Sequence, residues 1–445
     1  MTDELDQIFI SYKQPDFNAK LTELRLRICE ATTFNPRSEE GQKVAEIIEE
    51  VWKRGDVAVA EFTEKFDGVK LTPDQFGVSK ESLEKAHKQI EPALLESLRQ
   101  AIENVRKYQT EIFIGNKKHP GIKYTPIKRV GICVPGASAP LPSTVIMTAV
   151  PAIVAGVEQI VVVSPPRYKG GIHPVILAIC HELKTNKGLG CEEIRVYRIG
   201  GVQAVAALAD GTKKIPRVDK IVGPGNQWVQ TAKRVVFGQV GVDSVAGPSE
   251  VLIIANDKAN PAWVAADMLS QAEHAPGSAI MFSDSEEFGR KVLGELKIQV
   301  KVLERADETT QCLKKYSGIA VFDSIEEAIN WANEFAIEHL QIQCGEKSKE
   351  IAAKIENAGA IFIGEYSPVA VGDYWAGPSH TLPTGGGARF SSALTSNDFV
   401  KSISIIEYDK KKLAESAEDI IRLAEVEGLD AHAKSIEIRL KAEKD

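Results

Sequence analysis

The first third of the chain carries the residue spacing of amphipathic helices. Between residues 38 and 54, apolar residues recur at the i, i+3, i+4, i+7, i+8 positions that share one helix face. These residues are Val44, Ile47, Ile48, Val51 and Trp52. Gly55 follows them as a stop signal. Residues 91–109 repeat the spacing, so the pattern predicts a second and longer helix there.

From residue 129 onward, short β-branched runs alternate with helical patterns. The predicted strands cover residues 130–134, 159–164, 194–199, 220–222, 251–256, 279–283, 319–323 and 360–364. Short apolar runs separated by helical segments are typical of βαβ units with buried parallel strands. The pattern therefore predicts an α/β fold.

The predicted strands form two groups, one from about 129 to 240 and one from about 250 to 364. Each group is large enough for its own sheet, so we expect two related nucleotide-type domains. After about residue 392 the chain returns to helical patterns, at 413–426 and 431–440. This tail is too small to stand alone, so it must pack on the body or on another subunit.

The composition is that of a mildly acidic globular protein. The 445 residues include 54 Lys and Arg against 62 Asp and Glu, for a formal net charge of -8, and 43% are hydrophobic. These values exclude disordered, collagen-like and disulfide-scaffold proteins. They also argue against nucleic acid as a partner, because no basic block is present to release counterions from a phosphate backbone.

Cysteines and the N-terminus indicate the compartment. The six cysteines are scattered without any pair at C-x-x-C spacing, which fits a reducing environment. The first residues, Met1 to Asp6, are rich in carboxylates where a signal peptide has positive charge. We therefore predict a cytoplasmic protein.

An uncharged stretch from residue 130 to 157 is long enough to cross a bilayer. Four prolines interrupt it, at Pro135, Pro140, Pro142 and Pro151. Repeated prolines remove helix donors and clash with the preceding turn. We therefore interpret the stretch as buried strand, loop and helix, and we expect no membrane partner.

Two pairs of residues in the second strand group have the chemistry of a site. Gln271 and His274 lie three residues apart, so both side chains project from one face of the predicted helix and are able to share a metal or a substrate. The alternative is a helix end with a solvated histidine. Glu338 and His339 combine a carboxylate and an imidazole, the two components of acid–base catalysis near neutral pH. The alternative is a helix cap.

Two further segments carry candidate residues. Asp373 lies among glycines in a predicted loop after a buried strand, and α/β folds place ligands at the carboxyl ends of strands. An Asx turn is the alternative. Glu427 and His432 place a carboxylate and an imidazole in the tail, where the alternative is simple solvation.

Glycine-rich turns are candidates for phosphate binding at residues 200–203, 223–226 and 385–387. None completes G-x-G-x-x-G, because Trp228 occupies the third glycine position after Gly223 and Gly225. We predict strand-to-helix turns at these sites, able to hold a nucleotide at a helix N-terminus.

Taken together, these segments resemble the histidinol dehydrogenase family in order and spacing. The matching segments are residues 134–141, 223–226, 246–251, 269–274, 338–340, 372–374, 380–384 and 427–432. The resemblance covers nearly the whole chain. It departs at Cys133 and Ala137, where the family usually has a tyrosine and a second glycine, and at Ile337, where it has a proline.

The resemblance implies two incomplete Rossmann-like parallel-sheet domains and small helical terminal segments that are exchanged in a homodimer with shared active sites. We assign residues 1–35 to an N-terminal helical arm. Residues 36–128 and 250–391 form the first domain, which carries the metal and acid–base residues. Residues 129–249 form the second domain, on the NAD side, and 392–445 form a tail that packs on the partner subunit.

The resemblance also implies a reaction, the last step of histidine biosynthesis. L-Histidinol is oxidised to L-histidine in a four-electron process that passes through an aldehyde-level intermediate and consumes two NAD+. By position, the ligands of one zinc ion per subunit are Gln271, His274, Asp373 and His432.

Further roles follow by position. His339 is the base that takes the alcohol proton, and Glu338 activates the water added between the two oxidations. Ser249 and Glu427 contact the substrate, together with His339 and the four zinc ligands. Gln203 and Asn226 contact the dinucleotide. The Cys133 position is a cofactor contact in the family, so its change affects the dinucleotide site.

Three alternatives remain from the sequence. One is a relative with the same residues that oxidises a different alcohol, such as a sulfonated diol. Glu427 argues against it, because a carboxylate repels an anionic substrate. Another is a catalytically impaired homologue, motivated by Cys133. A hydrolytic zinc enzyme is the third, and it leaves the two nucleotide-type domains without a purpose.

Overall fold

The computed structural model describes residues 3–30, 38–136, 140–186, 191–274 and 276–441. Two units are distinguished: unit 1 comprises residues 1–114 and 126–400, and unit 2 comprises residues 115–125 and 401–445. Unit 1 contains a six-stranded and a five-stranded sheet, each with its own helices. We call these parts the six-stranded lobe and the five-stranded lobe.

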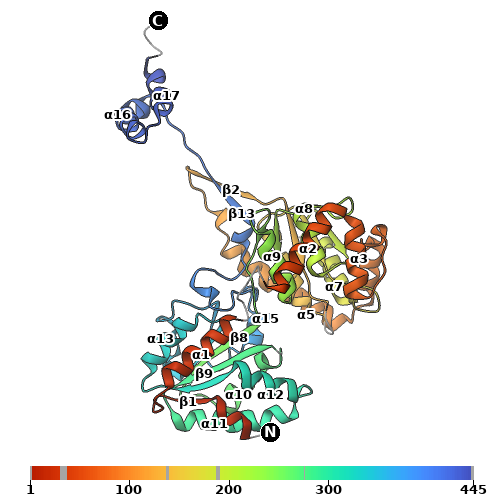
Figure 1. Cartoon of the computed structure of the whole chain (residues 1–445), viewed down its shortest axis with the longest axis vertical. Coiled ribbons are helices and arrows are strands. Elements are labelled where there is room, and N and C mark those ends of the chain that lie inside the picture. Colours follow the sequence, from red (N-terminus) through yellow and green to blue (C-terminus); the bar gives the residue numbers. More distant parts are fainter. Residues whose placement is uncertain (1–2, 31–37, 137–139, 187–190, 275, 442–445) are drawn as a thin grey trace. The chain divides into compact units, whose positions relative to one another are not determined.

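The six-stranded sheet is parallel throughout, in the order β1-β10-β9-β8-β11-β12. Its strands are β1 (Phe9–Ser11), β8 (Ser249–Ala255), β9 (Gly277–Ser283), β10 (Gly318–Val321), β11 (His339–Gln343) and β12 (Ala360–Ile363). Its helices are α1 (Phe17–Glu30), α10 (Pro261–Ala272), α11 (Glu286–Gln299), α12 (Ala306–Tyr316), α13 (Ile325–Phe335), α14 (Ser348–Ala352) and α15 (Val369–Tyr374). Helices α1 and α13 cover one face, and α10 and α11 cover the other (Figure 1).

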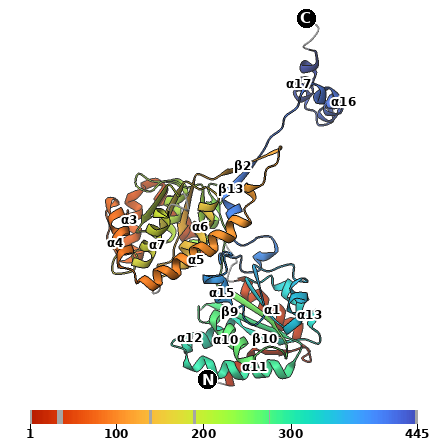
Figure 2. The ribbon, with the colours of Figure 1, turned by 180° about the vertical axis from the view of Figure 1, so that it is seen from behind.

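The five-stranded sheet is also parallel, in the order β5-β4-β3-β6-β7. Its strands are β3 (Arg129–Cys133), β4 (Gln159–Val163), β5 (Glu193–Tyr197), β6 (Lys220–Val222) and β7 (Gly241–Val242). Its helices are α2 (Glu39–Arg54), α3 (Asp56–Asp67), α4 (Lys80–Gln89), α5 (Pro92–Glu111), α6 (Pro142–Val154), α7 (Pro174–Thr185), α8 (Gly201–Asp210) and α9 (Gln227–Val236). Helices α4 to α7 pack on one face, and α2, α3, α8 and α9 pack on the other (Figures 1 and 2).

The sequence pattern located most of these elements. The helices predicted at 38–54 and 91–109 are α2 and α5, and the predicted strands match β3 to β6, β8 to β10 and β12 within three residues at either end. The uncharged stretch from 130 to 157 is buried strand and helix, as predicted. Within the described residues, no helix is long and apolar enough to cross a membrane.

Two domain assignments need correction. Residues 36–128 do not share a core with residues 250–391, because α2 to α5 bury their apolar faces against the five-stranded sheet. The N-terminal arm, predicted as wholly helical and exchanged with a partner, contains β1, which pairs with β10. Leu5 and Ile8 are buried in the core of the six-stranded lobe of the same chain. Residues 31–35 of the predicted arm lie outside the described residues.

Unit 2 contains most of a two-stranded sheet and a pair of helices. The strands are β2 (Ile122–Pro126) and β13 (Val400–Ser404), and the helices α16 (Lys410–Val426) and α17 (Asp430–Lys441) pack on each other. The predicted tail boundary at residue 392 is too early. Leu394 and Phe399 are buried in the core of the five-stranded lobe, so residues 392–400 belong to unit 1.

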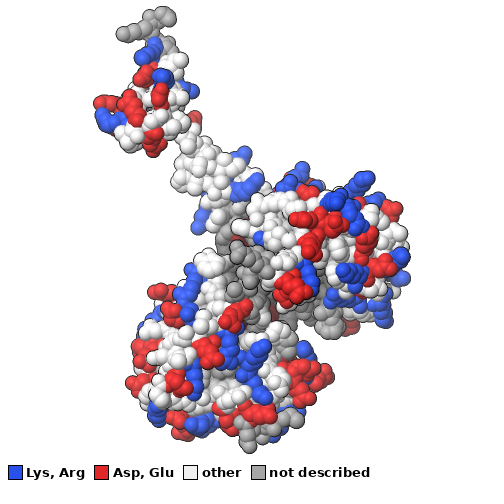
Figure 3. Space-filling view, in the orientation of Figure 1, with Lys and Arg blue, Asp and Glu red and all other residues white. Residues whose placement is uncertain are grey.

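Acidic and basic side chains are interspersed over the face of the molecule in Figure 3. Both lobes carry the two signs of charge side by side on this face. On this face, the acidic residues are therefore not gathered into one patch.

The corrected tail boundary predicts the effect of removing the Phe399 side chain. Phe399 is fully buried in the five-stranded lobe, so Phe399→Ala removes a large packed ring, and we expect a loss of about 3–5 kcal/mol of unfolding free energy. Phe237→Ala is the matched control, because Phe237 is 67% exposed on the same lobe. Urea unfolding measures both. Equal effects of the two substitutions would contradict the boundary.

Candidate active site

The candidate acid–base residues lie at the amino ends of strands in the six-stranded lobe. Ser249 is the first residue of β8, and His339 is the first residue of β11. His339 pairs in register with Val251 on one side and Ala360 on the other. The expectation of a site at the carboxyl ends of the strands is therefore wrong for this lobe. Asp373 reaches the site from α15, which follows β12, and not from a loop.

Hydrogen bonding fixes the protonation pattern of the His339 ring. Nδ1 of His339 lies 2.9 Å from the main-chain oxygen of Glu250. A carbonyl oxygen only accepts, so Nδ1 carries the proton and donates. In the neutral ring Nε2 then has a free lone pair. His339 is buried, and its Nε2 has no hydrogen-bond partner in the described part of the chain.

The Glu338 carboxylate lies on the other side of this ring from Nε2. One of its oxygens, Oε2, accepts hydrogen bonds from Ser249 Oγ at 2.9 Å and from the Glu250 main-chain N–H at 2.8 Å. The same oxygen is 3.4 Å from His339 Nδ1. The carboxylate is therefore fixed by three groups and faces the protonated side of the imidazole.

Two buried groups here have shifted pKa values. Burial disfavours the imidazolium form of His339, but the Glu338 carboxylate and Asp373 outweigh burial and raise the pKa of His339 to about 9. Burial, with the charge of Glu338, raises the pKa of Glu250 to about 8. Glu250 accepts a hydrogen bond from Gly385 N–H at 2.7 Å. The glycine run at 385–387 is thus an anchored loop and not the predicted strand-to-helix turn.

A cavity of about 220 Å³ opens beside the His339 ring. His339, Phe362, Asp373 and His380 are among the residues that line it. Asp373 Oδ1 lies 3.9 Å from His339 Nε2. Burial raises the pKa of Asp373, and the neighbouring His339, His380 and His274 oppose this rise. The structure therefore gathers a carboxylate and two imidazoles around one small cavity.

Gln271 and His274 approach this site from α10. The helix ends at Ala272, and His274 lies in the turn that follows, where its N–H donates to the Gln271 main-chain oxygen at 3.2 Å. Gln271 is 2% exposed, and its Oε1 is buried without a hydrogen-bond partner among the described residues. A buried amide oxygen without a donor is costly unless a ligand meets it.

Glu427 and His432 belong to unit 2. Glu427 caps the C-terminal end of α16, and His432 lies in the first turn of α17, where both are exposed. Unit 1 therefore contains Gln271, His274 and Asp373 of the predicted zinc ligands. Within the described residues, no three His, Cys, Asp or Glu side chains form a metal-binding group.

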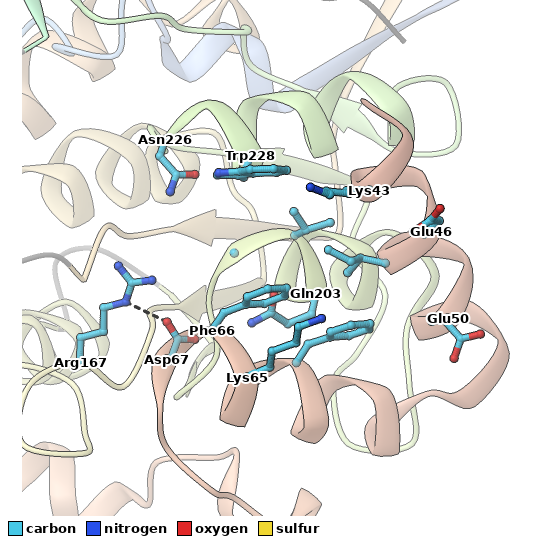
Figure 4. Close-up of a pocket in the computed structure, with 14 residues that line it drawn as sticks. Lys43, Glu46, Glu50, Lys65, Phe66, Asp67, Arg167, Gln203, Asn226 and Trp228 are labelled. Atoms are coloured by element: carbon cyan, nitrogen blue, oxygen red, sulfur yellow. Dashed lines mark hydrogen bonds and ion pairs between the residues drawn. The ribbon is translucent and has the colours of Figure 1, made fainter. Parts of the chain in front are cut away.

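The five-stranded lobe has its own cavity, of about 750 Å³ (Figure 4). Residues from α2, α3, α8, α9 and the segment after β4 line it. Trp228 and Phe66 present aromatic rings, and Arg167 forms an ion pair with Asp67 at 2.8 Å. The predicted dinucleotide contacts Gln203 and Asn226 both line this cavity.

The two predicted contacts differ in how their side chains are used. Asn226 caps α9, because its Oδ1 accepts from Val229 N–H at 3.2 Å. Gln203 is 1% exposed, and both polar atoms of its amide lack partners in the described residues. It lies in the first turn of α8, whose N-terminus has no side-chain cap. This end of α8 therefore offers free N–H groups and a free amide to a ligand.

The Cys133 departure lies against Gly223, in the same turn as the cavity-lining Asn226. Cys133 is the last residue of β3, and burial raises the pKa of its thiol to about 12. Gly223 has a φ of +107°, and a Cβ at Gly223 would lie 2.4 Å from the Cys133 main-chain oxygen. The predicted turns at 200–203 and 223–226 do join strands to helices, β5 to α8 and β6 to α9. Ala137 lies outside the described residues.

Comparison with known proteins identifies the family. Residues 33–440 match the sequence profile described as histidinol dehydrogenase. The chain belongs to the histidinol dehydrogenase family. It is 45% identical over 403 residues to histidinol dehydrogenase of Rhodopirellula baltica, covering 89% of this chain and 86% of that protein. With that of Oceanobacillus iheyensis it shares 46% identity over 406 residues, covering 89% and 92%.

A solved structure extends the likeness to the fold. The crystal structure of histidinol dehydrogenase from Elizabethkingia anophelis covers 98% of both chains, with a TM-score of 0.87 and 33% identity. Membership of the histidinol dehydrogenase family makes this chain an oxidoreductase.

The sequence does not mark His380 as a site residue, although the structure places it in the cavity beside His339. Burial lowers the pKa of His380, and the charge of Asp373 opposes that effect. A lone histidine before Thr381 in an irregular segment has no periodic partner that would mark it. Its place in a segment that matches the family was the one available signal.

The buried Glu250 predicts a pH-dependent stability. Its pKa of about 8 lies above the ordinary glutamate value, so the stability from the bound proton is present at low pH and is lost as pH rises through about 8. We expect the melting temperature of the parent to fall between about pH 5 and pH 9 relative to that of Glu250→Gln. Thermal melts at several pH values measure this. Parallel curves for the two proteins would contradict the assignment.

Proposed function

We propose that this chain oxidises L-histidinol to L-histidine in two successive hydride transfers to NAD+, with one zinc ion per subunit, as the last step of histidine biosynthesis. The observation that carries the proposal is the lone pair of the neutral His339 ring at a buried Nε2 that lies 3.9 Å from Asp373. The family membership gives this base its substrate class.

The base step uses the fixed tautomer of His339. Neutral His339 takes the alcohol proton at Nε2, while Nδ1 keeps its hydrogen bond to the Glu250 carbonyl. The resulting imidazolium faces the Glu338 carboxylate, 3.4 Å from Nδ1, which stabilises it. The predicted role of Glu338 in activating water at the aldehyde level adds to this electrostatic role.

Zinc fits the side chains at this site. Gln271, His274 and Asp373 would hold the ion together with His432 of the partner copy, and the buried Gln271 Oε1 without a partner supports this set. Zinc, when bound, supplies a positive charge that positions the substrate imidazole and amine. Ser249 and Glu427 complete the substrate contacts, and Glu427 favours a cationic substrate over an anionic one.

The cavity of the five-stranded lobe suits the dinucleotide. NAD+, when bound, supplies the hydride acceptor. The uncapped N-terminus of α8 favours a negatively charged group, and the Gln203 amide offers one donor and one acceptor without competitors. Trp228 and Phe66 give flat surfaces for an aromatic ring.

We propose that the active protein is a cytoplasmic homodimer with shared sites. Unit 2 exposes large apolar side chains in this single chain: Ile403, Ile405, Ile406, Tyr408, Leu423, Val426, Leu429 and Ile438. The edge strand β12 and the segment after it do the same, with Ile361, Ile363, Tyr366 and Tyr374. Such surface is unusual on a monomer, which supports a second copy as its partner.

The role of His339 is tested by His339→Asn. Because only the neutral form of His339 takes the alcohol proton, we expect the parental kcat/KM for histidinol to rise with pH until the His339 ring has lost its proton. In His339→Asn we expect about a 100-fold or larger loss and a flat profile, with zinc retained. Rates of NADH formation and zinc analysis measure this. A pH-dependent variant with near-parental activity would contradict the assignment.

The sharing of sites is tested by mixing two inactive variants. His432→Ala should lose zinc and activity, because His432 is a proposed ligand, whereas His339→Asn should lose activity alone. In a mixed dimer of the two, one site receives both intact residues, so about a quarter of parental activity should return after random exchange of subunits. Near-parental activity of zinc-depleted His432→Ala by itself would contradict the ligand set, and a mixture without activity would contradict the sharing.

The substrate is tested by comparing histidinol with sulfonated diols. We expect turnover of histidinol and none of the diols. Tight binding of zinc and histidinol without NADH formation would instead identify an impaired homologue.

A further inference from the structure

A buried ion pair lies beneath the loop at residues 223–226. Lys233, on α9, and Asp243, after β7, approach to 2.5 Å, and their side chains are 1% and 3% exposed. Neither residue lines the cavity of the five-stranded lobe. The pair is therefore placed to act on the cavity only through the loop.

Both members of the pair bind the main chain of Gly223. Lys233 Nζ donates to the Gly223 oxygen at 3.0 Å, and Asp243 Oδ2 accepts from the Gly223 N–H at 2.7 Å. Gly223 has a positive φ and no room for a Cβ against Cys133. Hydrogen bonds at the Gly223 N–H and C=O, and the close approach of β3 at Cys133, therefore hold Gly223 in this conformation.

A second residue on the same helix face extends the contact. Gln230, three residues before Lys233, donates to the Gly225 oxygen at 3.4 Å and accepts from the Ala246 N–H at 3.1 Å. The loop at 223–226 is thus joined to the segment at 243–249. That segment ends at Ser249, whose hydroxyl donates to Glu338 in the six-stranded lobe.

A contribution to folding stability does not by itself explain why Lys233 and Asp243 form a buried ion pair. Burying two charges costs desolvation energy that their attraction offsets only in part, and an apolar pair of similar volume is often as stable. What an apolar pair cannot supply is two directed hydrogen bonds to one glycine. The geometry is therefore better explained by positioning than by stabilisation.

We propose that Lys233, Asp243 and Gln230 are positioning residues that hold the 223–226 loop, and with it Asn226, in register with the segment that leads to Ser249 and Glu338. We call this group of three residues the α9 clamp. The clamp rests on the proposed function for the identity of its ligand, NAD+. It acts on dinucleotide binding and on the alignment of the two lobes' sites, not on zinc.

Two double variants separate hydrogen bonding from charge. Lys233→Gln with Asp243→Asn removes both charges but keeps a donor for the Gly223 oxygen and an acceptor for its N–H. Lys233→Met with Asp243→Leu removes the charges and both hydrogen bonds. The measurements are KM for NAD+, kcat at saturating NAD+, and NAD+ affinity from tryptophan fluorescence, since Trp228 lines the cavity.

We expect KM for NAD+ in the Lys233→Gln, Asp243→Asn double variant to stay within about threefold of the parental value. In the Lys233→Met, Asp243→Leu double variant we expect KM for NAD+ to rise about 10- to 100-fold. The effect on kcat should be smaller, and the zinc content should not change. The matched control is Arg99→Met with Glu182→Leu. This ion pair of the same lobe, at 2.9 Å, does not touch the loop and should leave KM unchanged.

An unchanged KM and NAD+ affinity in the Lys233→Met, Asp243→Leu variant would contradict the proposed role of the α9 clamp. Equal effects of the two double variants would contradict it as well. If the Lys233→Met, Asp243→Leu variant does not fold, Gln230→Met tests the same proposal with both charges in place. An unchanged KM for NAD+ in Gln230→Met would then contradict the proposal. Failure of the parent to oxidise histidinol would instead reject the proposed function, while fluorescence would still report whether the clamp affects NAD+ binding.

Discussion

The site depends on the hydrogen bond between His339 Nδ1 and the main-chain oxygen of Glu250. Because a carbonyl only accepts, this one contact decides which ring nitrogen holds the proton in the neutral imidazole and turns the free nitrogen toward Asp373. It joins β8 to β11 at the amino end of the sheet, where strand register holds both partners. The carboxylates of Glu338 and Asp373 then set the charge that the ring experiences.

The segment that leads into β8 connects the acid–base residues of the six-stranded lobe to the lobe that contains the larger cavity. The chain leaves β7 of the five-stranded lobe, passes Asp243 and Ala246, and enters β8 at Ser249. Contacts from α9 fix the start of this segment, and the Ser249–Glu338 hydrogen bond fixes its end. A dehydrogenase needs the hydride donor and acceptor held together, and this short covalent path, clamped at both ends, is suited to that need.

Periodicity revealed the elements but not their partners. The residue spacing shows the apolar faces of α2 and α5, yet an amphipathic face specifies burial and not the sheet that covers it. The spacing therefore does not tell which lobe residues 36–128 join. β1 has three residues, too few for a period-two signal. At the site, the chemistry of Glu338, His339 and Asp373 marks them as candidates, and their roles follow from the family resemblance. The tautomer of His339 and the approach of His380 depend on main-chain oxygens and loop paths that side-chain patterns do not encode.

Counting the NADH formed per histidinol consumed, with zinc-loaded protein and excess NAD+, is the most direct measurement of the proposed function. Two NADH and one histidine per histidinol are expected, because the base at His339 would serve both oxidations without release of the aldehyde-level intermediate. A yield of one NADH with free aldehyde, or no NADH at all with zinc and histidinol bound, would contradict the account.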